Sequence, residues 1–84
     1  MVNFHAMVED ARDLVYAELR SASRPKYMLE SQLHAILDEL DKMDRIQDAG
    51  QFFPYYPKGI SDSWDRLDPL GLKLSELLDV YRKL

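Results

Sequence analysis

Cysteine is absent from this chain, and glycine is scarce, with three residues in 84. Without cysteine the chain can form neither a disulfide framework nor a thiolate metal site. The few glycines are scattered, so no glycine-rich loop can cradle a phosphate group and no serine lies in a nucleophile turn. No run of residues approaches the roughly 20 apolar positions of a membrane-spanning helix. Residues 1–11 also lack the apolar stretch of a signal peptide. We therefore expect one cytoplasmic domain over residues 1–84, with no membrane partner.

Positive charge is also in short supply, because 11 basic residues face 15 acidic ones and leave a net charge of −4. Nucleic-acid binding requires a basic face, so we expect no direct nucleic-acid partner. A basic protein partner is compatible with this charge. Residues 38–68 contain eight acids and four bases, so the excess lies in the second half of the chain. We interpret this region as a negative surface for a cationic partner; solubility alone is the alternative.

Apolar residues recur at intervals of three and four in residues 4–22, 25–48 and 69–84. This is the spacing of a helix that buries one face. In the second segment, positions 29, 33, 36, 40 and 43 follow a heptad-like spacing, which is typical of helices that pack at a shallow angle. Short connections make consecutive helices antiparallel. The sequence therefore predicts an all-α fold, a small antiparallel bundle of three long helices.

Each predicted helix follows a residue that is suited to capping. Asn3, Ser23 and Asp68 carry side-chain oxygens that can accept hydrogen bonds from first-turn N–H groups. Pro25 and Pro69 then occupy first-turn positions, where the N–H that proline lacks would have no partner in the helix. These signals place the starts of the three helices.

The connection between the second and third helices is rich in aromatic residues and proline. Residues 52–59 contain four aromatic rings and two prolines, which disfavour a helix interior or a central strand. We expect an extended crossover with a short fourth helical element at residues 61–66, capped by Ser61.

A domain of this size buries only about 60% of its unfolded surface, so the four rings cannot all be buried. We expect Phe52 or Phe53 to point inward, and Tyr55 and Tyr56 to point at least partly outward. Tyrosines beside acidic residues are typical of a protein-binding hot spot. The alternative is that the rings close one end of the bundle. Trp64 is expected to anchor the loop in the core.

Residues with catalytic or metal-binding chemistry are few. His34 and Asp38 lie one helical turn apart, but a convincing metal site needs three or four ligands. The aspartates spaced by three over residues 62–68 lack the glycine and terminal glutamate of a calcium loop. We predict no metal, no cofactor and no enzymatic activity. A small metal-dependent or acid–base enzyme would need a pocket centred on His5 or His34.

The segment Tyr55-Tyr56-Pro57-Lys58 resembles the Tyr-Tyr-Pro element of the helical immunity proteins that neutralise nuclease colicins and pyocins. The acidic segment at residues 33–43 is similar to the second helix of these proteins, and residues 68–72 resemble the turn that opens their last helix. Residues 71–84 also resemble the immunity protein of the tRNA-cleaving colicin D. This resemblance implies that the acidic helix and the two tyrosines bind a toxin at an exosite beside its active site.

The residue pattern and the resemblance together predict an immunity-type inhibitor of a basic nuclease toxin. Its association with the toxin should be fast at low salt and slower as the salt concentration rises. The alternatives are a small helical adaptor or regulator, and a homodimer paired through the heptad-like stripe. The candidate partner-binding residues are Asp41, Asp44, Asp48, Phe53, Tyr55 and Tyr56.

Overall fold

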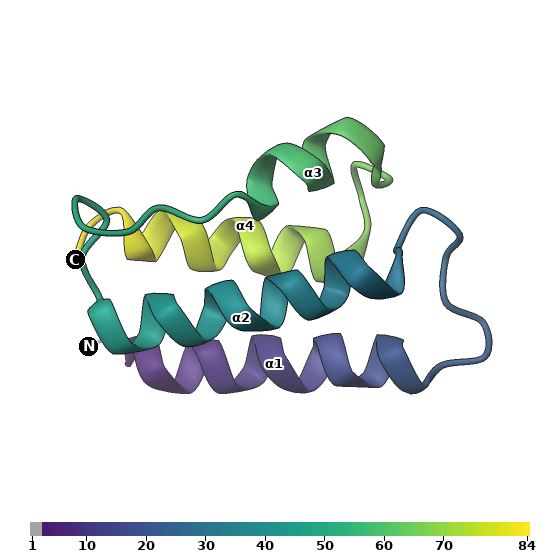
Figure 1. Cartoon of the computed structure of the whole chain (residues 1–84), viewed down its shortest axis with the longest axis horizontal. Helices are drawn as coiled ribbons and strands as arrows, with labels where there is room; N and C mark the ends of the chain where they lie inside the picture. Colours follow the sequence, from purple (N-terminus) through teal and green to yellow (C-terminus); the bar gives the residue numbers. More distant parts are fainter. Residues whose placement is uncertain (1–2) are drawn as a thin grey trace.

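The computed structural model describes residues 3–84 and contains four helices in that range. These are α1 (Phe4–Arg20), α2 (Glu30–Ile46), α3 (Tyr56–Ser63) and α4 (Pro69–Tyr81). The predicted all-α class, with three long helices and one short helix, is confirmed, but α2 and α4 run in the same direction, so the second and third long helices are not antiparallel as predicted (Figure 1). Helix α1 contacts both α2 and α4, and α3 contacts the same two helices. Figure 1 shows α1 running opposite to α2 and α4, with α3 lying across these two on the side away from α1.

The starts of α1 and α4 agree with the predicted caps. The Asn3 side chain accepts a hydrogen bond from the Ala6 N–H at 3.2 Å. The buried Asp68 carboxylate accepts hydrogen bonds from the N–H groups of Leu70 and Gly71, at 2.9 and 3.2 Å. Both caps are local contacts across two or three residues, which is why the sequence alone predicts them.

Helix α2 begins at Glu30, five residues after the predicted start at Pro25. The chain after Pro25 forms a single turn, in which the Met28 N–H donates to the Pro25 carbonyl at 3.0 Å. The Met28 side chain is buried in the core and fastens this turn onto the bundle. Ser23 is not the cap, because the residue before α2 is Leu29, which makes no side-chain capping hydrogen bond.

The predicted helix ends lie beyond the observed ones. Helix α1 ends at Arg20 rather than residue 22, and α4 ends at Tyr81 rather than residue 84. Helix α2 ends at Ile46, because Gln47 adopts a left-handed conformation with φ of 47°. The Gln47 N–H still donates to the Met43 carbonyl, at 2.8 Å. A left-handed residue turns the chain out of the helix, which ends α2 before Asp48.

The short fourth helix is displaced from its predicted position at residues 61–66. It spans Tyr56–Ser63, with Pro57 in its first turn. A proline is tolerated there because first-turn N–H groups have no partner in the helix. Pro57 therefore lies at the start of α3 instead of excluding a helix, and Ser61 lies inside α3 rather than capping it.

Three buried aromatic residues hold α3 and the crossover against the long helices through their polar ends. The Tyr56 hydroxyl donates to the Leu74 carbonyl at 2.9 Å, and the Trp64 indole N–H donates to Gln32 Oε1 at 2.8 Å. The Tyr81 hydroxyl lies 2.6 Å from the Phe52 carbonyl oxygen. Buried tyrosine and tryptophan usually find such partners. Trp64 is thus a core anchor, as predicted. The rest of the apolar core includes Phe4, Val8, Ala11, Val15, Leu33, Ile36, Leu40, Met43, Leu74 and Leu77.

No helix within residues 3–84 is both long enough and apolar enough to cross a membrane.

Candidate protein-binding site

The aromatic cluster of the crossover is divided between the interior and the surface. Phe52 is partly buried and packs against the core, so the prediction that one phenylalanine points inward is confirmed. Phe53 is 44% exposed and Tyr55 is 84% exposed. Tyr56 is only 4% exposed, so the prediction that it points at least partly outward is wrong.

Tyr56 is buried because adjacent residues of a helix point about 100° apart. When Tyr55 faces solvent at the start of α3, Tyr56 turns toward α4 and its hydroxyl reaches Leu74. Burial, together with the nearby charge of Glu39, raises the pKa of Tyr56 above its ordinary value. The ring is therefore neutral and structural, and it closes α3 onto the bundle.

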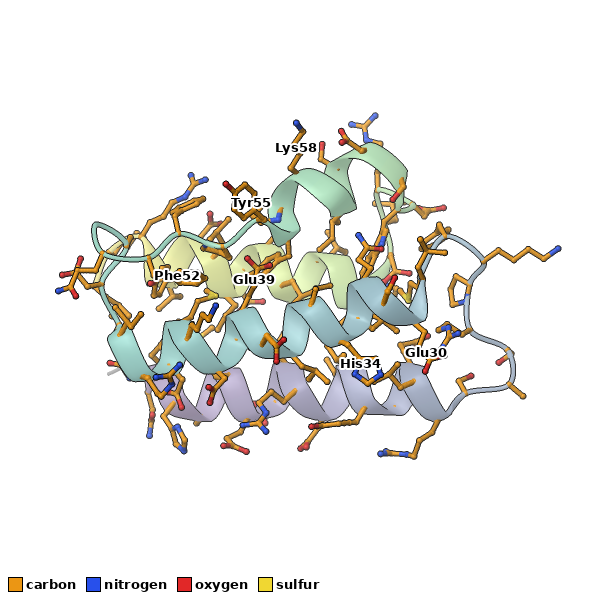
Figure 2. The ribbon with its side chains drawn as sticks, in the orientation of Figure 1. Glu30, His34, Glu39, Phe52, Tyr55 and Lys58 are labelled. Atoms are coloured by element: carbon orange, nitrogen blue, oxygen red, sulfur yellow. The ribbon has the colours of Figure 1, made fainter. Side chains whose placement is uncertain are left out.

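The backbone of Tyr55 is held in place although its ring is free. The Tyr55 N–H donates to the carboxylate of Glu39, which projects from α2 toward the crossover. Figure 2 shows Tyr55 at the start of α3 and Glu39 below it on α2. Glu39 was not a candidate at the sequence level, because nothing local distinguishes it from the other acids of α2. Its role depends on a contact across 16 residues.

Two cations stack on the phenylalanine rings of the crossover. Lys42 Nζ lies 5.7 Å from the centre of the Phe52 ring, and the Arg82 guanidinium lies 5.5 Å from the centre of the Phe53 ring. These distances are within the range of cation–π attraction. The contact from Arg82 links the Phe53 ring to the C-terminal end of α4, which restricts its motion.

A hollow of about 410 Å³ lies between the two exposed rings. We call this hollow and its lining the aromatic surface. It is predominantly apolar, with the Lys58 side chain at its margin (Figure 2). The lining residues are Phe53, Pro54, Tyr55, Pro57 and Lys58.

The three candidate aspartates each have a partner within the chain. Asp41 is exposed and accepts a hydrogen bond from Arg45 Nε at 3.1 Å. Asp44 is mostly covered, and one of its oxygens lies 2.7 Å from His5 Nδ1. The Asp48 carboxylate accepts a hydrogen bond from the Gly50 N–H at 2.8 Å, which forms an Asx turn. Asp44 and Asp48 thus make contacts within the fold.

The candidate residues do not gather on one face. At about 100° per residue, Asp41 lies roughly 160° around α2 from Glu39, which faces the crossover. Asp44 turns toward α1, where it meets His5. The exposed Asp38 lies on the arc between Glu39 and Asp41, on the side of α2 away from the core. The structure therefore brings Phe53 and Tyr55 together and leaves Asp38 and Asp41 on the outer face of α2.

The two histidines lie apart. His5 is close to Glu9 and Asp44, whereas His34 Nε2 is 3.8 Å from Glu30, near the other end of α2. The ten residues from His34 to Asp44 span about 15 Å of helix. Within residues 3–84, no group of three or more histidine, aspartate or glutamate side chains is arranged to hold a metal ion.

Comparison with known proteins adds no constraint on this surface. No family model, curated protein or solved structure matches the chain. The resemblance to immunity proteins therefore stays a prediction, and the functional argument depends on the contacts described above.

Proposed function

We propose that the protein is an immunity-type inhibitor that binds a basic nuclease toxin in the cytoplasm. The aromatic surface and the outer face of α2 would form the binding site. The observation that supports this proposal most strongly is the state of Tyr55. Its ring is 84% exposed, while its backbone N–H is bound by Glu39. A large aromatic ring on an anchored backbone loses little conformational entropy on binding, which is characteristic of hot-spot residues.

The outer face of α2 carries acids that suit a cationic partner. Asp38 and Asp41 are exposed on this face, and the whole chain carries −4. The Asp41–Arg45 pair is more than half exposed at both ends, so it contributes little to stability and a partner's cation can replace Arg45 at small cost. Negative charge next to an apolar contact steers a basic protein into position and raises the association rate.

In the proposed mechanism the inhibitor blocks its partner without any chemical step. The exposed rings would pack into an apolar recess of the partner, and the acids of α2 would pair with its basic surface. That surface is the part of a nuclease that must hold the phosphate backbone. A bound acidic protein would then exclude nucleic acid by its bulk and by its charge.

The heptad-like stripe is not available to pair two copies of the chain. Four residues of the heptad-like stripe are at most 1% exposed, because they pack inside the bundle. These residues are Leu33, Ile36, Leu40 and Met43. A helical adaptor with another kind of partner would use the same aromatic surface. The experiment below distinguishes an adaptor from an inhibitor.

The proposal is tested by affinity capture from lysate of the source cell with three baits. These are the wild type, Tyr55→Ala, and Tyr16→Ala as a control. The Tyr16 ring is 40% exposed on α1, away from the aromatic surface. We expect the wild type and Tyr16→Ala to capture the same basic protein at a one-to-one ratio and to suppress its nuclease activity in proportion. Loss of a hot-spot ring costs about 2 kcal/mol or more, so Tyr55→Ala should bind roughly 30-fold more weakly.

Salt provides a second arm of the same experiment. Raising the ionic strength from about 0.01 M to 0.15 M shortens the Debye length from about 30 Å to 8 Å, so association should slow. Equal capture by the wild type and Tyr55→Ala would refute the assigned surface. A captured protein that keeps its full activity, or that has no nuclease activity, would refute inhibition and favour the adaptor.

A further inference from the structure

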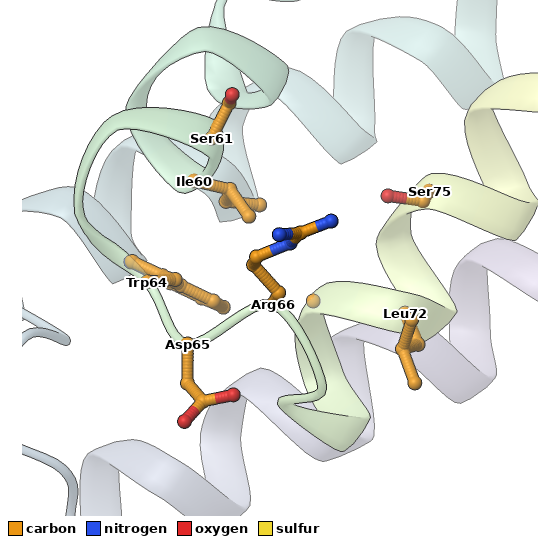
Figure 3. Close-up of a pocket in the computed structure, with 8 residues that line it drawn as sticks. Ile60, Ser61, Trp64, Asp65, Arg66, Leu72 and Ser75 are labelled. Atoms are coloured by element: carbon orange, nitrogen blue, oxygen red, sulfur yellow. The ribbon is translucent and has the colours of Figure 1, made fainter.

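A second hollow, of about 330 Å³, lies at the opposite end of α3 from Tyr55. It opens between the last turn of α3, the turn after it and the first two turns of α4 (Figure 3). The eight residues of α3 span about 12 Å, so this hollow is separate from the aromatic surface. A ligand could occupy one site without covering the other.

Part of the wall of this hollow is apolar and firmly held. Trp64 is 5% exposed, and its indole N–H is fastened to Gln32 at 2.8 Å. Ile60 is partly buried and packs against the core, and Leu72 is 51% exposed at the opposite side of the opening. Gly71 contributes backbone and no side chain to the lining. A rigid wall of this kind can accept an apolar side chain without rearranging.

A single cation, Arg66, enters this hollow. The Arg66 side chain extends between α3 and α4, and the Ser75 hydroxyl group points toward it (Figure 3). Within residues 3–84 the ion pairs involve other cations, although the chain is rich in acids. The neighbouring Asp65 points away, because its carboxylate accepts the Leu67 N–H at 2.8 Å. The guanidinium therefore offers a planar set of donors that match a carboxylate.

The hollow continues beyond Arg66 over exposed apolar surface. A second depression is lined by Trp64, Asp65, Arg66 and Leu67, so the two hollows share Trp64, Asp65 and Arg66. Leu67 is 78% exposed, and Leu72 on the other side is half exposed. The cation thus lies between two apolar patches, one at Leu72 and one at Leu67. An extended polypeptide fits this arrangement.

We propose that this surface, which we call the Arg66 site, binds an extended acidic segment of a protein partner. The segment would carry a glutamate between two apolar side chains. In an extended chain, side chains at positions i, i+2 and i+4 point to the same face. The central carboxylate would pair with the Arg66 guanidinium, one apolar side chain would lie against Leu72, and the other would lie against Leu67. This inference does not depend on the proposed inhibitor function, because it uses another face and a partner segment of opposite charge.

The test uses the peptide acetyl-Leu-Ser-Glu-Ser-Leu-amide, with glutamine in place of glutamate as the control peptide. Trp64 is the only tryptophan, so its fluorescence and its indole N–H resonance report on this site alone. We expect saturable changes in both signals and in the Gly71 and Ser75 amide resonances. A charge-assisted pair contributes more than a neutral hydrogen bond, so the control peptide should bind at least roughly tenfold more weakly.

Two variants with the same change in charge separate a specific site from general attraction. Arg66→Gln should weaken binding of the glutamate peptide roughly tenfold and remove the preference over the glutamine peptide. Arg20→Gln, at the exposed end of α1, should bind like the wild type. Both arginines are exposed, so both variants should keep the unfolding midpoint of the wild type.

Several outcomes would overturn the proposal. These are no saturable change at ~5 mM peptide, equal binding of the two peptides, or equal binding by the wild type and Arg66→Gln. Resonance changes centred on Tyr55 would place the peptide on the aromatic surface instead. Sodium acetate serves as a further control ligand. If acetate bound as tightly as the peptide, a small carboxylate would suffice for binding and no extended segment would be recognised.

Discussion

Tyr55 and Tyr56 are neighbours in sequence, yet their replacement by alanine should have very different effects on stability. Tyr56 is 4% exposed, and removal of a buried aromatic side chain costs about 3–5 kcal/mol. Part of this cost is the hydrogen bond to the Leu74 carbonyl, so Tyr56→Phe isolates that part at about 0.5–1.5 kcal/mol. Tyr55 is 84% exposed, and Tyr55→Ala should change the free energy of unfolding by about 0.5 kcal/mol or less.

Urea unfolding followed by far-UV circular dichroism measures all three variants. The expected order of unfolding midpoints is wild type and Tyr55→Ala together, then Tyr56→Phe, then Tyr56→Ala. A domain of this size has a total stability of about 5–15 kcal/mol, so Tyr56→Ala removes a large fraction of it. A loss above about 2 kcal/mol for Tyr55→Ala, or below about 1 kcal/mol for Tyr56→Ala, would refute the burial argument. Because Tyr56 supports the fold, the binding experiment replaces Tyr55 alone.

Three further predictions concern backbone conformation, helix propensity and pH. Gln47 has a positive φ, which costs a residue with a side chain about 1–2 kcal/mol. Gln47→Gly should therefore raise the free energy of unfolding, measured in urea, by about 0.5–1 kcal/mol. A lowered unfolding midpoint would contradict the assignment of Gln47 as the cap. A Cβ added at Gly71 would meet the Trp64 ring at 3.4 Å, which is an ordinary contact. Gly71→Ala should therefore raise the free energy of unfolding by up to about 1 kcal/mol, because alanine favours a helix more than glycine does. A lowered free energy of unfolding would reveal a clash. The hydrogen bond from Tyr27 to the Asp68 carboxylate, at 2.5 Å, raises the pKa of Tyr27 to about 12. Because the pKa of Tyr27 in the folded state exceeds the unfolded value of about 10, the hydrogen bond contributes its full stability below pH ~10 and loses it as the pH rises toward 12. The free energy of unfolding, measured over this pH range, should therefore fall less steeply in Tyr27→Phe than in the wild type. An unchanged slope would exclude a stabilising role for this hydrogen bond.

The sequence by itself determined the helical class and the starts of α1 and α4. The apolar periodicity requires one buried face per helix, and the caps at Asn3 and Asp68 are contacts with N–H groups two or three residues away. Interactions of such short range depend little on the rest of the fold. The inward position of one crossover phenylalanine and the burial of Trp64 could also be predicted, although the sequence did not decide between Phe52 and Phe53.

Tertiary structure decided the parts of the chain where local signals compete. Pro25 is a good first-turn residue, but burial of Met28 holds the chain in a single turn and delays α2 to Glu30. Pro57 looked like a helix breaker in the sequence, but it begins α3, since Tyr56 and Trp64 dock this short helix onto α2 and α4.

The candidate binding site depends even more on long-range contacts. Tyr55 and Tyr56 have the same side chain and adjacent positions, so no local pattern distinguishes the exposed ring from the buried one. Their difference follows from the orientation of α3, which the Glu39 carboxylate and the Leu74 carbonyl hold through contacts across 16 and 18 residues. The sequence predicted that this loop carries surface rings beside acids, and only the packing of α3 decided which ring reaches solvent.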